Sequence, residues 1–544
     1  MANLCLLNKI LLFVALLLYA GTSFAQQKTI RGKVTDARDG AALPGVTVRL
    51  KEVSGIGTVS GADGTYSLEV PVAGHTLIFS YVGYDNLEVP ITGTSMNVEL
   101  KSGQALNEVV VIGYGTQRKK DLTGSVSSIQ AINFNKGIAT SPEQLIQGKV
   151  AGLQVINNSG QPGAAITVKI RGNNSIRSGN NPLYVVDGVP LDGRTPRPSL
   201  NLSLNGAGLG QTPDADPLIY INPNDIASID ILKDASATAI YGSRGANGVI
   251  LITTKRGQAG PLKVDVNASV GVSNIMKRID VLTPSQYRSA LKTYGASNSD
   301  SGANVNALDA ILRTGVTQNY SLAFSSGNDN GFYRASFLAS DQEGIIRKSG
   351  LTKYVANLNG EYRLLDQKLT IDLNLTTAQY TENIVPVTNT AGSNGNLIAD
   401  ALNWNPTLAL KGSNGYYNLL GGGSYNPLAL NAAYSDVDAV STILGNISAS
   451  YKITSDLVYK FLYGINHGTA VRKGNIDGWY NEPGISGVGN AFLGNGELNS
   501  QTFTHTLNFT KQITPDFNLN ALVGYEYWKT NFSGSQFTAY GFQT

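Results

Sequence analysis

Apolar and polar residues alternate along much of the second half of the chain. The stretch "KVDVNASVGVS" places Val264, Val266 and Ala268 on one face and the polar residues between them on the other. The same alternation recurs in "KLTIDLNLTT" and "DFNLNALVGYEYW". Because successive side chains of a strand point to opposite faces, residues 262–544 are predicted to form about nine β-strands.

The connections between these segments alternate in length. Short links are predicted at residues 327–331, 365–367, 454–456 and 514–516, and long links at residues 274–317, 342–352, 382–440 and 468–501. Short turns on one side, long loops on the other and strands of about ten residues are typical of a transmembrane β-barrel. A soluble β-sandwich also alternates its faces, but it gives less reason for this regular rhythm. The first long link also contains "TPSQYRSALKTY", whose spacing predicts an amphipathic helix.

The N-terminal quarter of the chain shows two further patterns. Residues 1–25 read as a secretory signal peptide, because Lys9 precedes a run of about eleven apolar residues and "SFA" ends the segment. That run is too short to cross a bilayer, which takes about 20 residues. Residues 28–101 contain short alternating stretches such as "GVTVRL" and "GTYSLEV", separated by glycine-containing turns. They predict an immunoglobulin-like β-sandwich.

Residues 115–257 mix strand-like stretches, possible helices and many glycines, which predicts a compact domain of mixed α/β structure. Ser141, followed by proline and glutamate, is a helix start signal. Arg171 is expected to be buried and paired, because a buried charge needs a partner. Asp187 precedes a glycine and is expected in a hairpin turn, and Asp234 is expected in a turn before a helical piece.

Composition excludes several classes of function. The net charge of +3 gives no support for nucleic-acid binding, and the single cysteine, Cys5, lies in the predicted signal peptide. His75, His467 and His505 are far apart and lack metal-ligand spacing. No HExxH, GxSxG or P-loop motif occurs, and "GAGLG" lacks the dinucleotide-binding spacing. We therefore expect no enzyme activity, no cofactor and no metal.

The stretch "ALNEVVVIGYGTQRKK" places an apolar strand-like run between the two predicted N-terminal domains. Within residues 105–114, the segment Glu108, Val109, Val110, Val111 and Ile112 has a strand edge that neither domain uses. Such a segment can add to the sheet edge of another protein through main-chain hydrogen bonds. An ordinary linker, or an extra strand of the preceding sandwich, is the alternative.

Several motifs in order resemble the SusC/RagA family of TonB-linked outer-membrane transporters. "LPGVTVRLK", "DGTYSL" and "FSYVGY" are similar to the family's carboxypeptidase-regulatory-like domain. "LIQGKVAGLQV", "IRGNNSI", "PLYVVDGVP" and "IDILKDASATAIYGSRGANGVILITTKRG" are similar to its plug domain. The matching plug positions are expected to have structural or gating roles: Arg171, Gly172, Asp187, Gly188, Lys233, Asp234, Tyr241, Gly242, Arg244, Asn247 and Gly248. Gly245 departs mildly from the family pattern, in which a second small residue, alanine, is expected.

The resemblance implies a mainly β protein in the outer membrane, with the N-terminal domain and the plug on the periplasmic side. It also implies a barrel of about 22 strands filled by the plug. The segment 108–112 resembles the TonB box, which the TonB C-terminal domain captures as an added strand. A SusD-like surface lipoprotein would act as a lid, and the substrates would be large nutrients, either glycans or peptides. A non-transporting adhesin or signalling receptor on the same scaffold is the alternative.

The length of the strand region departs from this pattern. Residues 262–544 hold about nine strands of the expected number, so the barrel is expected to be incomplete and the chain truncated. An open sheet would leave unpaired backbone groups in lipid, each costing several kcal/mol. We therefore expect that this chain alone does not make a working transporter.

Overall fold

The computed structural model describes residues 27–542, with gaps. Residues outside the description within that range are 38, 54–55, 72–73, 82–83, 85, 102–108, 113–114, 119–124, 174–178, 199–213, 388–395, 416, 419, 422–423, 483–484, 487–488 and 515–516. The predicted signal peptide therefore lies outside the described residues. Within the described part, no helix is long and apolar enough to cross a membrane.

The N-terminal domain consists of two small β-sheets. One sheet has the order β4–β1–β7 and the other the order β3–β2–β5–β6. The strands are β1 (Gln27–Asp36), β2 (Thr47–Leu50), β3 (Gly57–Val59), β4 (Thr65–Pro71), β5 (Thr76–Ser80), β6 (Leu87–Pro90) and β7 (Val98–Leu100). Their inward residues, including Ile30, Val48 and Phe79, form one buried apolar cluster. The alternating stretches thus form strands as predicted.

The plug domain is built around a five-stranded sheet with the order β10–β15–β16–β13–β14. Its strands are β10 (Val126–Gln130), β13 (Leu183–Val186), β14 (Val189–Pro190), β15 (Ile226–Leu232) and β16 (Val249–Thr254), and a separate hairpin pairs β11 (Leu153–Asn157) with β12 (Ile166–Ile170). Short helices connect them: η2 (Ala131–Asn133), η3 (Pro142–Ile146), η4 (Pro223–Asp225), α2 (Ala235–Thr238) and η5 (Ala239–Gly245). Nearly every residue of β15 and β16 is buried, so apolar runs rather than alternating patterns mark these strands.

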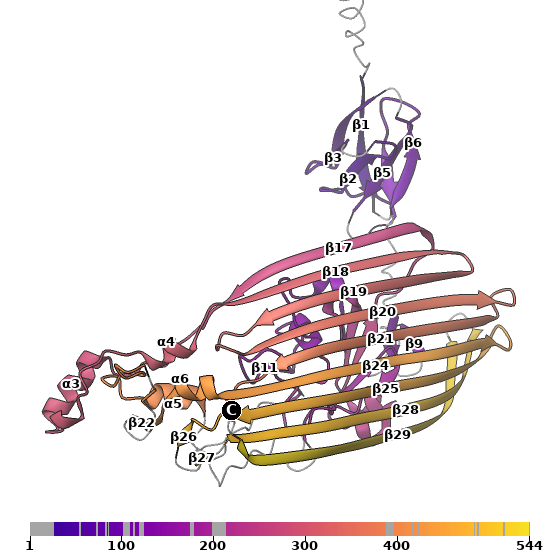
Figure 1. Cartoon of the computed structure of the whole chain (residues 1–544). Coiled ribbons are helices and arrows are strands. Elements are labelled where there is room, and N and C mark those ends of the chain that lie inside the picture. Colours follow the sequence, from indigo (N-terminus) through magenta and orange to yellow (C-terminus); the bar gives the residue numbers. More distant parts are fainter. Residues whose placement is uncertain are drawn as a thin grey trace, which may run out of the picture. The chain divides into compact units, whose positions relative to one another are not determined.

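Nine antiparallel strands form one curved sheet, called the wall here (Figure 1). They pair in chain order: β17 (Gly260–Ser273), β18 (Gly315–Asn328), β19 (Gly331–Glu343), β20 (Gly350–Leu364), β21 (Leu369–Asn383), β24 (Tyr434–Lys452), β25 (Leu457–Ile476), β28 (Gly489–Thr514) and β29 (Phe517–Phe542). The sheet is not closed, since β17 and β29 stand at opposite ends of the strand order. The nine strands confirm the prediction, but they are 13 to 26 residues long, longer than the predicted ten.

The two faces of the wall have opposite chemistry. In β21, Leu373 and Leu375 are exposed, whereas Asp372 and Asn374 are buried. The exposed apolar face is the one that a lipid bilayer would cover, and the polar face is buried against the plug. The alternation predicted from the sequence is therefore confirmed, with the apolar side directed away from the protein interior.

The long connections gather at one end of the wall (Figure 1). They contain α3 (Pro284–Thr293), η6 (Ser297–Ser299), α4 (Ala307–Ile311), α5 (Leu397–Asn403), α6 (Pro427–Ala433) and the short strands β22 (Leu420–Gly421), β23 (Ser424–Tyr425), β26 (Asn481–Glu482) and β27 (Ile485–Ser486). Helix α3 lies in the predicted amphipathic stretch and begins with a capping box between Thr283 and Gln286. Helices α4, α5 and α6 share a buried apolar cluster with Trp404 and Tyr480, which we call the loop core.

Candidate functional site: the contact between plug and wall

Polar side chains on the inward face of the wall contact the plug along several strands. On β19, the Arg334 guanidinium lies 2.9 Å from the Asp225 carboxylate at the end of η4. Ser336 donates a hydrogen bond to the same carboxylate, and so does Asn222, at 2.8 Å. Three donors from two parts of the chain therefore hold one buried plug carboxylate.

The segment after β16 is held in the same way. Arg256 lies 2.8 Å from the Asp372 carboxylate of β21. The Asn359 amide of β20 donates to the Thr254 hydroxyl at 2.8 Å and to the Lys255 carbonyl at 3.1 Å. This anchors the end of the plug sheet to the wall.

A buried lysine of β20 connects two plug segments. The Lys353 ammonium donates to the backbone carbonyls of Thr140, at 2.9 Å, and Ile219, at 3.1 Å. Buried amines without partners are costly, and these carbonyls satisfy two of the three donors. The lysine therefore ties the start of η3 to the segment before β15.

The buried carboxyl group of Asp216 lies near this lysine, and that of Glu143 lies near Asp216. Burial and the nearby Asp216 carboxylate raise the pKa of Glu143 to about 8. Burial also raises the pKa of Asp216, while a hydrogen bond from the Leu218 amide and the charge of Lys353 act in the opposite direction. Ser141 donates to Glu143, so it does not cap the short 3₁₀ helix η3 that forms where a helix start was predicted.

One ion pair and one hydrogen bond join the wall to the plug segment that precedes residue 199. Arg197 of the plug lies 2.7 Å from Glu382 of β21, and both side chains are almost fully buried. Arg472 of β25 pairs with Asp436 of β24 at 2.6 Å and donates to the Pro198 carbonyl at 2.9 Å. Because buried pairs lose much free energy when one partner is removed, these contacts fix the plug segment against the wall.

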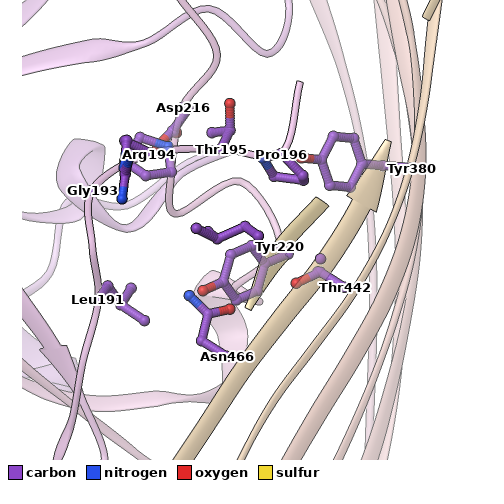
Figure 2. A pocket seen from close by; sticks show the side chains of 13 residues that line it. Leu191, Gly193, Arg194, Thr195, Pro196, Asp216, Tyr220, Tyr380, Thr442 and Asn466 are labelled. Atoms are coloured by element: carbon purple, nitrogen blue, oxygen red, sulfur yellow. The ribbon is translucent and has the colours of Figure 1, made fainter. Parts of the chain in front are cut away.

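Figure 2 shows the small cavity next to this segment, lined by Arg194, Thr195 and Pro196 of the plug and by Tyr380 and Thr442 of the wall. Its volume is about 10 Å³, room for about one water molecule. The plug segment and the wall are therefore in close contact here, with no space for a larger molecule between them.

Arg171 and Gly172 lie in a turn after β12, with φ angles of 57° and 92°. Both residues are exposed. The prediction that Arg171 is buried is therefore wrong. Its charge lies near the Asp234 carboxylate. The left-handed turn turns its side chain toward solvent, where the guanidinium needs no buried partner.

Asp187 and Gly188 form the turn between β13 and β14, with φ angles of 47° and 87°. The Asp187 carboxylate accepts bonds from the Thr254 amide, at 2.9 Å, and hydroxyl, at 2.8 Å. Burial raises the pKa of this carboxyl group. The Asp187 carbonyl accepts a 3.0 Å bond from Asn446 of β24, so the turn also contacts the wall.

Lys233 and Asp234 join β15 to α2. The Lys233 ammonium donates to the Ala151 carbonyl at 3.1 Å. The Asp234 carboxylate caps α2 and also accepts from the Ser125 amide, and these backbone bonds lower the pKa of Asp234. Both residues organise the local backbone.

The motif after α2 combines a buried ring, tight glycines and one wall contact. Tyr241 is buried, and Gly242 has a φ of 59°. Gly248 has a φ of 92°, and a Cβ there would lie 2.6 Å from Ile170. Arg244 pairs with Glu526 of β29, and its guanidinium carbon lies 4.9 Å from the Trp528 ring centroid.

Two further motif positions are explained by backbone contacts. The Asn247 amide donates to the carbonyls of Gly179, at 3.2 Å, and Asn181, at 3.4 Å. Gly245, the departure from the family pattern, has no room for a side chain, because a Cβ would lie 2.9 Å from the Thr238 carbonyl oxygen.

The candidate TonB-box segment forms a hairpin strand. Val109–Ile112 is β8, which pairs with β9 (Gly115–Arg118) in a two-stranded sheet. No other described strand pairs with β8. Glu108 lies outside the described residues. One strand edge of β8 is therefore used within the chain.

Two domain families match the N-terminal half. The CarboxypepD_reg-like domain matches residues 30–111, and the TonB-dependent Receptor Plug Domain matches residues 118–249. The TonB-dependent receptor P3 of Formosa agariphila is 34% identical over 98% of this chain and 51% of its own length. The TonB-dependent receptor SusC of Bacteroides thetaiotaomicron is 34% identical over 81% of this chain and 44% of its own length.

The chain belongs to the SusC/RagA-like TonB-dependent receptors. Its fold is similar to that in a solved structure of the RagAB peptide importer in the "open-open" state, with a TM-score of 0.67. That match has 24% sequence identity and covers 80% of this chain and 50% of the RagAB chain. The receptor chain spans about half the length of these relatives. Its relatives are receptors and not enzymes, in agreement with the sequence prediction. Among the described residues, no cluster of three potential metal-binding side chains occurs.

Sequence reasoning missed most of the wall residues that contact the plug in this receptor. Arg334, Lys353 and Asp372 fall on the polar face of a predicted strand, whereas Glu382 and Arg472 lie in stretches predicted as long links. The sequence signal that could have identified such contacts is a long charged side chain on the polar face of a strand.

Proposed function

We propose that this chain is part of a TonB-dependent importer of large nutrients, glycans or peptides, in the outer membrane. The family membership supports import across that membrane. The observation that carries the proposal is a polar wall face closed by a plug through buried ion pairs, such as Arg334 with Asp225. Such a plug blocks passage until it is moved.

In this proposal the segment 108–112 transmits the pull. The TonB C-terminal domain adds a strand to β8, either at its free edge or in place of β9. The N-terminal domain and the plug face the periplasm, where TonB acts, and residues 1–25 serve as the export signal. A SusD-like lipoprotein covers the loop end of the wall and retains the nutrient.

The test is a deletion of residues 108–112 in the protein of full family length. We expect energy-dependent uptake to be lost and binding of the nutrient to purified protein to be retained. The control is a deletion of equal length in the loop of α3, at residues 295–299, which leaves the box intact. Normal uptake by the box deletion contradicts the proposed role of this segment, and an adhesin or signalling receptor would show no energy-dependent uptake in any variant.

A further inference from the structure

Four glycines lie on the inward face of two neighbouring wall strands, where the plug covers them. Gly464 and Gly468 belong to β25, and Gly494 and Gly496 belong to β28. We call these four residues the glycine seat. Since they carry no side chain, the backbone of another segment can approach the wall closely at this place.

Plug residues 189–198, which we call the seated segment, fill the glycine seat. A Cβ at Gly464 would lie 2.9 Å from a methyl carbon of Val189, and one at Gly496 would overlap the Pro196 carbonyl oxygen. The other two glycines of the seat approach proline rings of the same segment. Any larger residue in the seat would therefore collide with the seated segment.

The seated segment begins at an edge of the plug sheet. Strand β14 is the last in the sheet order and has two residues, and the described residues 191–198 contain no helix or strand. Two charged contacts restrain the segment: the ion pair of Arg197 with Glu382 and the hydrogen bond from Arg472 to the Pro198 carbonyl. Because the segment lies outside the main strands, it can leave the seat while β13, β15 and β16 stay paired.

The plug is attached to the wall far from the seat in the strand order. Residues 255–259 connect β16 to β17, the first of the nine wall strands, whereas β25 and β28 are the seventh and eighth. Beside this connection, Arg256 pairs with Asp372, and Asn359 donates to Thr254. A domain attached at one side is expected to hinge about that attachment, so the largest displacement falls near the seat.

Uncharged polar side chains flank the seat. Asn466 of β25 and Thr442 of β24 line the small cavity beside the seated segment (Figure 2). On β28, Thr502 is paired with Gly464 in the strand register and is 1% exposed. Its hydroxyl has no hydrogen-bond partner among the residues that the structure describes. A buried hydroxyl without a partner is costly, and it gains one when water or a polar molecule replaces the segment.

We propose that the passage for the nutrient opens along the glycine seat, between the seated segment and strands β24, β25 and β28, while the contacts with β19 and β20 stay closed. This inference rests on the proposed function and adds which side of the plug opens. The seat suits this role, because no wall side chain obstructs the segment as it withdraws. The flanking amide and hydroxyl groups then line the vacated space.

The test labels single cysteines in the full-length protein, in cells grown on peptone and mixed polysaccharides, with a water-soluble maleimide. Thr502→Cys places a thiol beside the seat. Ser340→Cys is the matched control on β19, since Ser340 is also buried, at 3% exposure. Labelling rates are compared between energised cells and cells treated with a protonophore, with the protein lacking an introduced cysteine as background. Each variant is also measured with residues 108–112 deleted.

We expect Thr502→Cys to react on the order of tenfold faster in energised cells, because opening exposes a side chain that is buried in the closed plug. Deletion of residues 108–112 should abolish this difference, and Ser340→Cys should react at one slow rate throughout. Energy-dependent labelling of Ser340→Cys, alone or together with Thr502→Cys, overturns the choice of side and leaves the proposed transport intact. Absence of energy-dependent labelling at both positions overturns this inference and contradicts the proposed transport as well.

Discussion

At the scale of single residues, the contact between plug and wall depends on buried charges that satisfy one another. The Asp225 carboxylate accepts hydrogen bonds from Arg334, Ser336 and Asn222. The Lys353 ammonium donates hydrogen bonds to two plug carbonyls. Each of these groups is expensive to leave without a partner in the protein interior. The stability of the contact is therefore sensitive to single substitutions.

Asp225→Ala removes the carboxylate that Arg334 faces at 2.9 Å. We expect a loss of about 3 kcal/mol in the stability of the plug against the wall, because the buried Arg334 guanidinium loses its nearer partner and keeps Asp265, at 3.4 Å. Pulse proteolysis of the plug in urea measures this loss. The control Asp329→Ala changes an exposed turn residue and should shift stability by less than about 0.5 kcal/mol. Equal effects of the two variants would contradict the role of the buried pair.

Glu143 makes plug stability depend on pH. Its pKa is raised from 4.5 to about 8 in the fold, so the folded state keeps a proton that the unfolded state loses. This contribution is full below pH 4.5 and is lost as pH rises through about 8. We expect the urea midpoint of the plug to fall over that window, and Glu143→Gln to flatten the fall. Glu69→Gln, in the N-terminal domain, should leave the profile of the plug as it is.

At the scale of elements, the strands of the wall and the helices of its loops differ in what stabilises them. Each wall strand shares a long ladder of backbone hydrogen bonds with every strand next to it in the sheet. Helix α3 has no buried residue, so its stability comes from local features such as the capping box. Helices α4, α5 and α6 are short and form because they bury apolar faces in the loop core.

Thr283→Ala tests this difference at α3. The Thr283 hydroxyl accepts from the Gln286 amide, and the Gln286 side chain accepts from the Thr283 amide. Removing the hydroxyl should cost about 1 kcal/mol of helix stability. Hydrogen exchange of the α3 amides should become about fivefold faster, while exchange in the wall stays constant. Ser285→Ala is the neighbouring control, and unchanged exchange in Thr283→Ala would contradict the capping role.

At the scale of the whole molecule, several strands of the wall hold the plug at once. Arg197 with Glu382 and Arg256 with Asp372 hold separate plug segments. The narrow cavity beside the Arg197 segment leaves room for about one water molecule. The attachment of the plug to the wall is thus distributed over several contacts.

The double variant Arg197→Gln with Arg256→Gln should loosen the plug in the full-length protein. We expect outer membranes that carry it to admit large antibiotics such as vancomycin, because two anchors between plug and wall are lost. Growth inhibition measures the leak. Arg288→Gln, which breaks a loop ion pair with Asp300, is the control and should not leak. If the double variant is expressed at the normal level and does not leak, the other contacts between plug and wall are sufficient to hold the plug in place.

The sequence alone determined the strands of the wall, the chemistry of their two faces and the short turns, because these follow from the local alternation of side chains. It also identified the family through ordered motifs. Only the tertiary structure decided which charges pair, since Arg334 and Asp225 are 109 residues apart and Asn446 and Asp187 are 259 apart. It likewise decided that Arg171 is exposed and that the loops build their own apolar core. Residues so distant in sequence come into contact only when the plug packs against the wall, so a local sequence pattern cannot predict these pairs.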